Sequence, residues 1–177
     1  MTAGPPTAFQ RSYWVIPGKL MADCYPGAKT AAEAQEKLNG MVAAGIRHTV
    51  SLMEEGETGR HGEPFVPYEA PFRSRGINCV RMPIRDMNIP SVDEMRAILD
   101  GIDSGIAAGT PTYVHCWGGK GRTGTVVGCY LIRHGLAQPA SAVDRITELQ
   151  AMTNGTLSPS PENERQRRFV AEWMPGQ

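Results

Sequence analysis

The chain has 177 residues, of which 41% are hydrophobic and 20% charged, and its formal net charge at pH 7 is zero. That length favours one globular domain with a sizeable core. The balanced charge argues against a nucleic acid partner, and no apolar stretch is long enough for membrane insertion.

The predicted elements alternate between strand and helix. Residues 1–11 are predicted to be a flexible lead, and residues 12–177 a single domain. Strands are predicted at 12–16, 20–24, 46–53, 77–82 and 111–115. Helices are predicted at 30–44, 68–75, 91–108, 125–134, 139–152 and 161–173. This order indicates an α/β fold, in which helices flank a central, mostly parallel sheet of about five strands.

The most informative segment is the loop after the last predicted strand, which reads His-Cys-Trp-Gly-Gly-Lys-Gly-Arg-Thr-Gly over residues 115–124. It joins the carboxyl end of a strand to a helix N-terminus, where free N–H groups and the helix dipole bind anions. Its glycines allow the backbone to curl around a tetrahedral oxyanion. The loop is therefore predicted to bind phosphate.

Two side chains of this loop add chemistry to the binding site. Arg122 can offer a planar fork to two phosphate oxygens. An electropositive cup of this kind favours the thiolate form of Cys116. A thiolate beneath a bound phosphoryl group is a nucleophile aimed at phosphorus.

The loop resembles the signature of the cysteine-based protein tyrosine phosphatase superfamily, which is His-Cys, five residues, Arg, then Ser or Thr. The fixed positions are His115, Cys116, Arg122 and Thr123. The resemblance implies that Thr123 donates to the departing sulfur, and that His115 orients the loop and favours the thiolate. The residues expected to bind the phosphate with Arg122 are Trp117, Gly118, Gly119, Lys120 and Gly121.

Cleavage of a phosphate ester also needs a proton for the leaving oxygen. Asp86 lies in the segment Met-Pro-Ile-Arg-Asp-Met-Asn-Ile-Pro at 82–90, which resembles the general-acid loop of the dual-specificity branch. The strand before it is expected to neighbour the signature strand, so that both loops emerge at one sheet edge. Asp93 is the alternative acid, although a carboxylate in the first turn of a helix is already explained by the helix dipole.

The tail at 158–169 extends the resemblance, because related phosphatases place a glutamine near here to position the hydrolytic water. Gln166 is the glutamine of this chain, but it is expected about one turn inside a helix that Glu162 begins. Gln166 is therefore either a supporting residue of the site or a packing or capping residue.

The four cysteines are too few for a disulfide scaffold and favour a reducing cytoplasm. Cys24, Cys79 and Cys129 are expected to be small buried side chains. Some relatives protect the nucleophile by a reversible disulfide, and Cys79, which is expected on a strand adjacent to the signature strand, is the candidate partner here.

These features predict a tyrosine or dual-specificity phosphatase that acts through a phosphocysteine, without metal or cofactor, on phosphotyrosine proteins and more slowly on phosphoserine or phosphothreonine. A phosphoinositide or inositol-phosphate phosphatase is the alternative. Its loop reads Cys-Lys-Ala-Gly-Lys-Gly-Arg, of which Lys120 matches the second lysine and Trp117 replaces the first. A non-catalytic phosphate-binding module, and sulfur transfer or arsenate reduction, remain less favoured because neither needs Asp86.

Overall fold

The fold is built on a five-stranded sheet, here described from a computed structural model that covers residues 5–153 and 159–177. The strands are β1 (Tyr13–Ile16), β2 (Leu20–Asp23), β3 (His48–Ser51), β4 (Asn78–Arg81) and β5 (Thr112–His115). Their order across the sheet is β1-β2-β5-β3-β4. Only the β1–β2 pair is antiparallel among the pairings of these strands. The predicted α/β class and the mostly parallel five-stranded sheet are confirmed.

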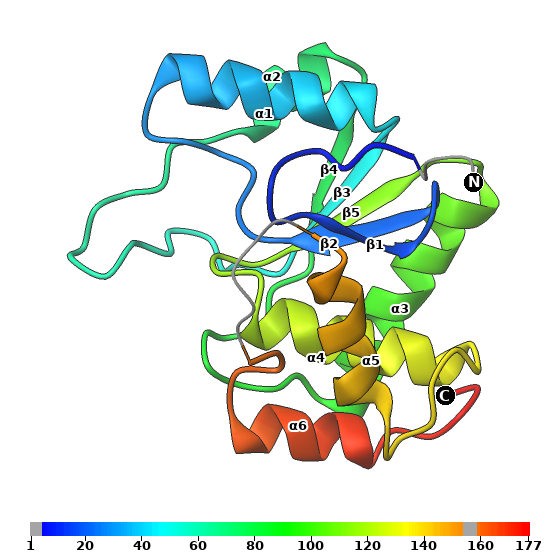
Figure 1. The fold of residues 1–177 in the computed structure, drawn as a ribbon. Helices are drawn as coiled ribbons and strands as arrows, with labels where there is room; N and C mark the ends of the chain where they lie inside the picture. Colours follow the sequence, from blue (N-terminus) through cyan, green and yellow to red (C-terminus); the bar gives the residue numbers. More distant parts are fainter. Residues whose placement is uncertain (1–4, 154–158) are drawn as a thin grey trace.

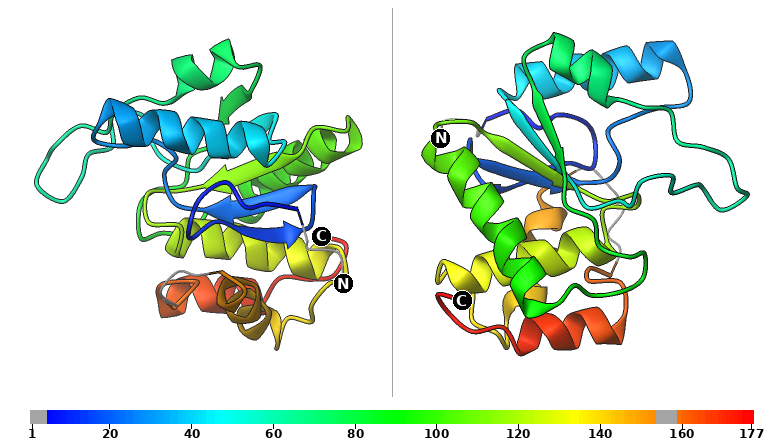
Figure 2. Two further views of the ribbon diagram at one scale, coloured as in Figure 1. Left: turned by 45° about the horizontal axis from the view of Figure 1, so that its top comes forward. Right: turned by 180° about the vertical axis from the view of Figure 1, so that it is seen from behind.

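Helices cover both faces of the sheet (Figures 1 and 2). On one face lie α1 (Ala31–Ala43) and α2 (Glu69–Ser74). On the other lie α3 (Val92–Ala107), α4 (Gly121–Arg133), α5 (Ala142–Ala151) and α6 (Glu164–Ala171). Among the described residues, none of the helices has the length and apolar character needed to span a bilayer.

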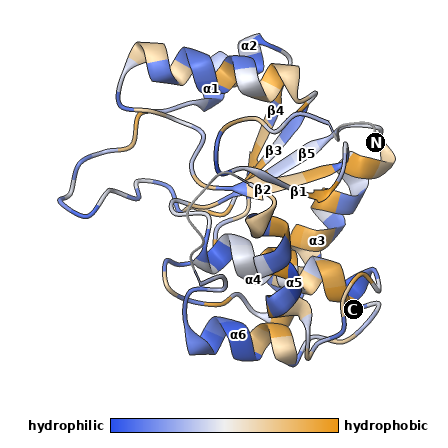
Figure 3. Ribbon diagram, in the orientation of Figure 1, coloured by the Kyte–Doolittle hydropathy of each residue, from blue (hydrophilic) through white to orange (hydrophobic). Residues whose placement is uncertain are grey.

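Two apolar cores follow from these two layers, and Figure 3 shows hydrophobic colouring on β2, on parts of the other strands and on parts of α3. Side chains alternate across a strand, so neighbouring residues enter different cores. Val114 belongs to the larger core, which includes α3 and α4, whereas Tyr113 belongs to the smaller core with α1 and α2. Two-sided burial explains why all four residues of β5 are buried, although the strand carries Thr112 and His115.

The strand order corrects one expectation. β3 pairs with both β5 and β4, so β4 is not a neighbour of the signature strand. The loop after β4 nevertheless reaches the same sheet edge, because its backbone continues along β3. The N–H groups of Met82 and Ile84 donate to the carbonyls of Ser51 and Leu52, at 2.8 and 3.0 Å.

The helix after the signature loop begins earlier than predicted. α4 starts at Gly121 rather than at 125, so the loop proper ends at Lys120. The glycines of this segment favour a loop, so the sequence did not predict this first helical turn. The early start matters, because it places Arg122 on a rigid helix.

Residues 8–11 of the predicted flexible lead contact the domain in the structure, whereas residues 1–4 lie outside the described part. Ala8 is buried, the Phe9 ring packs edge-on against Tyr113 at 5.9 Å, and Arg11 forms an ion pair with Asp23.

Candidate active site

Cys116 lies at the carboxyl end of β5, on the floor of a cleft of about 1130 Å³. Its side chain is almost fully buried, at 3% exposure. The first turn of α4 brings Arg122 to the same cleft. Among the predicted phosphate-binding residues, those that line the cleft are Trp117, Gly118, Lys120, Gly121 and Arg122. Gly119 instead faces Asp23, whose carboxylate oxygen an added Cβ would approach to 2.5 Å.

The Arg122 guanidinium is buried and heavily paired. Its two terminal nitrogens donate to the two carboxylate oxygens of Glu57, both at 2.7 Å. Asp86 lies 3.0 Å from Nη2, and the carbonyl of Ile84 accepts from Nη1 at 3.2 Å. The remaining donor, Nε, is buried without a partner among the described residues. A phosphate oxygen is a natural acceptor for this N–H.

Glu57 is the site residue that the sequence reasoning missed. It lies in the loop after β3, whose carboxyl end faces the same sheet edge as that of β5. A run of acidic residues directly after a central strand, Glu54, Glu55 and Glu57, was the available signal. Its meaning depends on knowing that the strand pairs with β5.

The structure places Asp86 at the cleft and Asp93 outside its lining. Asp86 lines the cleft and is half exposed, at 54%. Asp93 is 92% exposed on α3, where it pairs with Arg96 at 3.1 Å. Between β4 and α3, Met87 has a φ of 58°, an uncommon backbone conformation for a residue with a side chain. Asp86 therefore lies where a general acid would need to be, and its role stays a prediction.

The loop of Asp86 is tied to α6. Arg165 donates to the Asn88 side chain at 2.9 Å, and Asn163 donates to the Met87 carbonyl at 3.0 Å. Gln166 is fully buried, and its Nε2 donates to the Asn88 carbonyl at 3.2 Å.

Gln166 combines capping with a position at the cleft. It is the N3 residue of a capping box with Asn163, and helix α6 begins at Glu164 rather than at Glu162. Its amide also lies over Gly121, where an added Cβ would meet Nε2 at 2.9 Å. The sequence left open whether Gln166 caps a helix or supports the site, and the structure allows both roles for this residue.

His115 is a neutral, fully buried ring. Burial lowers its pKa to about 3. Its Nδ1 lies 3.2 Å from the Cys116 carbonyl, which can only accept, so Nδ1 carries the proton. Its Nε2 then accepts from the Tyr68 hydroxyl at 2.6 Å. His115 therefore contacts the backbone of Cys116, and it carries no charge that could attract the thiolate.

Thr123 is buried in the first turn of α4, and its hydroxyl donates to the Asp23 carbonyl at 3.4 Å. The donation to the sulfur that the family resemblance implies stays a prediction. The structure contradicts the predicted position of Cys79, the proposed disulfide partner of Cys116. It lies on β4, two strands from Cys116, and its side chain enters the other core.

Aromatic and basic side chains form the walls of the cleft. Tyr25 and Trp117 both pack against Phe65, with ring centroids 5.1 and 5.9 Å apart. The Arg60 guanidinium lies 5.6 Å from the centroid of the Trp117 ring. Lys29 and Lys120 also line the cleft. The walls of the cleft thus offer both apolar rings and positive charge.

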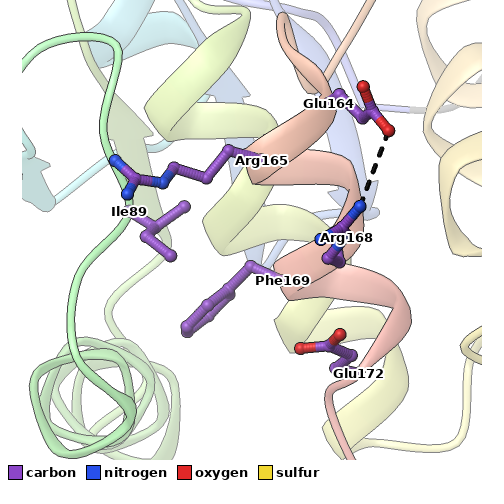
Figure 4. A pocket seen from close by; sticks show the side chains of 6 residues that line it. All are labelled: Ile89, Glu164, Arg165, Arg168, Phe169 and Glu172. Atoms are coloured by element: carbon purple, nitrogen blue, oxygen red, sulfur yellow. Dashed lines mark ion pairs between the residues drawn. The ribbon is translucent and has the colours of Figure 1, made fainter.

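A second, smaller hollow of about 410 Å³ lies on the outer side of the Asp86 loop. Figure 4 shows Arg165 and Phe169 extending from α6 toward Ile89, while Glu164 and Arg168 pair across the helix surface. None of the predicted site residues lines it. Within residues 5–153 and 159–177, no group of three His, Cys, Asp or Glu side chains is placed to hold a metal ion.

The fold and the site together define a class of enzyme, the cysteine-dependent phosphomonoesterases of the protein tyrosine phosphatase type. Residues 9–169 match a family model described as "PTP-SAK: Swiss Army Knife protein, DSP-PTPase phosphatase domain". The chain belongs to this dual-specificity phosphatase family.

Relatives with established names include both lipid and protein phosphatases. The chain is 34% identical over 130 residues to phosphatidylglycerophosphate phosphatase PTPMT2 of Arabidopsis thaliana, covering 73% of this chain and 51% of that protein. It is 25% identical over 142 residues to dual specificity protein phosphatase CDC14B of Mus musculus, covering 68% of this chain and 24% of that protein. The chain spans 30–60% of the length of the curated relatives that match at 32–34% identity.

The solved structures agree on the fold. Tk-PTP in its active form matches with a TM-score of 0.71 at 22% identity, over 93% of this chain and 97% of that chain. At this level of identity the likeness concerns architecture alone.

Proposed function

We propose that the chain hydrolyses phosphotyrosine in proteins or peptides, with slower action on phosphoserine and phosphothreonine. The observation that carries the proposal is the meeting of three groups in one cleft. Cys116 lies on the floor, Arg122 beside it, and Asp86 3.0 Å from the guanidinium of Arg122. This arrangement unites a nucleophile, an oxyanion clamp and an acid.

In the first step, the Cys116 sulfur attacks phosphorus in line with the ester bond. An S–P bond forms while the P–O bond to the leaving group breaks. Arg122 and the loop amides hold the equatorial oxygens and their developing charge. Asp86 gives its proton to the leaving oxygen, which departs as an alcohol or phenol. This role requires Asp86 to turn from Arg122 toward the substrate.

In the second step, water attacks the phosphocysteine. Asp86, now ionised, removes a proton from the water, a P–O bond forms and the S–P bond breaks, releasing inorganic phosphate and the thiolate. Gln166 is suited to hold this water, because its amide lies beside Gly121 and lines the cleft. Thr123 is assigned to the departing sulfur on the family resemblance alone.

The preference for phosphotyrosine is supported by the aromatic wall. Tyr25, Phe65 and Trp117 border the cleft that contains Cys116, and they offer apolar contact to a phenyl ring. An aliphatic phosphoserine would leave this surface unused.

A phosphoinositide or inositol phosphate is the second candidate substrate. It is favoured by the basic lining, which includes Lys29, Arg60 and Lys120, and by the similarity, 30% identity over 95 residues, to an Arabidopsis thaliana protein named as a phosphatidylinositol 3,4,5-trisphosphate 3-phosphatase and protein-tyrosine-phosphatase. We further propose a cytoplasmic location, which is supported by the four free cysteines.

One panel tests these assignments. We would measure kcat/KM for phosphotyrosine, phosphoserine and phosphothreonine peptides, a phosphoinositide in mixed micelles and an inositol polyphosphate, in the presence of EDTA. The phosphotyrosine peptide is expected to be the best substrate. A tenfold preference for an inositol substrate, about 1.4 kcal/mol of transition-state stabilisation, would establish the alternative.

Cys116→Ser is expected to abolish turnover while retaining affinity for tungstate, a tetrahedral oxyanion. The matched control is Cys129→Ser, a buried cysteine of α4 outside the cleft. Turnover by Cys116→Ser at the rate of the control would refute the cysteine mechanism.

A further inference from the structure

The mechanism above leaves one buried acid unexplained. Asp23, the last residue of β2, has a side chain only 3% exposed, and its Oδ2 has no partner among the described residues. Burial raises the pKa of this carboxyl group, and the guanidinium of Arg11 opposes that rise. A charge buried at such cost is normally retained for a structural or functional reason.

Asp23 lies directly beneath the phosphate loop. Gly119 adopts a φ of +73°, and a Cβ there would come within 2.5 Å of the Asp23 carboxylate. The Thr123 hydroxyl donates to the Asp23 carbonyl on the other side of the loop. The end of β2 therefore lies against the phosphate loop and supports it from below.

Arg11 links the end of β2 to the loop itself. The same nitrogen, Nη2, donates to the Asp23 carboxylate at 3.1 Å and to the Gly118 carbonyl at 2.8 Å. Because the peptide group is planar and trans, a carbonyl drawn toward Arg11 turns the N–H of Gly119 the opposite way. Arg11 thus sets the orientation of one peptide of the phosphate nest.

The residues before β1 form a turn that holds the Arg11 side chain in this position. The Ser12 hydroxyl and N–H both donate to the Phe9 carbonyl, at 2.8 and 3.0 Å, and close a tight turn around Arg11. The carbonyl of Ala8 fits against Gly40 of α1, where a Cβ would come within 1.8 Å. These contacts anchor the turn to the domain.

We propose that Arg11, oriented by Asp23, is a positioning residue of the phosphatase reaction. It fixes the Gly118–Gly119 peptide so that the loop is organised for an oxyanion before substrate arrives. Such preorganisation is effective because the donors need not reorient as charge develops. This inference rests on the proposed function, since it concerns the same phosphate loop.

The test separates anion binding from turnover. In the Cys116→Ser background, Arg11→Ala is expected to weaken tungstate binding, measured by calorimetry, by about tenfold, or 1.4 kcal/mol. With Cys116 intact, the same change is expected to lower kcat for a phosphotyrosine peptide by a similar factor. Arg11→Lys should recover part of both losses, because an ammonium can still bridge a carboxylate and a carbonyl.

The matched control is Arg96→Ala, which removes an exposed arginine that pairs with Asp93 on α3. Tungstate affinity of Arg11→Ala within twofold of this control would overturn the proposal. Asp23→Asn provides a second route should Arg11→Ala fail to fold. It is expected to cause a similar loss of affinity, and a loss under twofold would equally overturn the proposal. If Cys116→Ser alone binds no tungstate and the parent has no turnover, the proposed function fails instead.

Discussion

Replacing Glu57 by Gln tests how Arg122 is held in the cleft. The Glu57 carboxylate accepts hydrogen bonds from both terminal nitrogens of Arg122 at 2.7 Å, and the Arg122 side chain is only 1% exposed. The amide of Gln is nearly isosteric, but it presents one acceptor and one donor. The substitution therefore removes the negative charge and places an amide N–H donor opposite an N–H donor of the Arg122 guanidinium.

The expected loss follows from the partners that remain. Breaking a buried ion pair costs about 3–5 kcal/mol when the other charge is left alone. Here Asp86 stays 3.0 Å from Nη2, and the Ile84 carbonyl 3.2 Å from Nη1. We therefore expect a smaller loss of unfolding free energy, about 2–3 kcal/mol. For a domain of this size, that lowers the melting temperature by about 4–12 °C.

Thermal unfolding with and without tungstate provides the assay. A bound oxyanion supplies Arg122 with the counter-charge that Glu57→Gln has removed, so tungstate should raise the melting temperature of the variant more than that of the parent. Glu55→Gln is the control, because Glu55 is exposed in the same loop. Equal melting temperatures for the two variants, or equal tungstate shifts in variant and parent, would refute this reasoning.

Three further predictions concern the acid, the buried histidine and the loop lysine. Asp86→Asn is expected to lower kcat by roughly 10²–10⁴, and by less for substrates with acidic leaving groups, whereas Asp93→Asn should change kcat little. The reverse pattern in steady-state assays would assign the general acid to Asp93. Because the pKa of His115 is lowered to about 3 and an unfolded histidine titrates near 6.5, the unfolded state binds more protons between these values. Unfolding free energy should then fall as pH drops through this window, and urea titrations should show a shallower fall for His115→Gln; an unchanged slope contradicts the assignment. Lys120→Ala should reduce kcat/KM for inositol polyphosphates more than for aryl phosphates, and equal reductions would show that Lys120 does not select polyanions.

The sequence by itself determined the local features of this protein. The spacing of Cys116 and Arg122 needs no distant partner, because one strand end, one loop and one helical turn bring them together. The capping box of Ser91 and Glu94 at the start of α3 is likewise local, because the two residues are three positions apart. Alternating strands and helices were enough to predict the α/β class, since a parallel pair requires a crossover between its strands.

Only the tertiary structure decided which distant segments meet at the loop. β3 lies between β5 and β4, which brings Glu57 onto Arg122 and separates Cys79 from Cys116. The turn before β1 crosses the end of β2 and brings Arg11 onto Gly118, 107 residues away. These contacts depend on strand order and on how helices pack over the sheet. Such pairings are chosen by burial of the whole chain, and no local residue pattern encodes them.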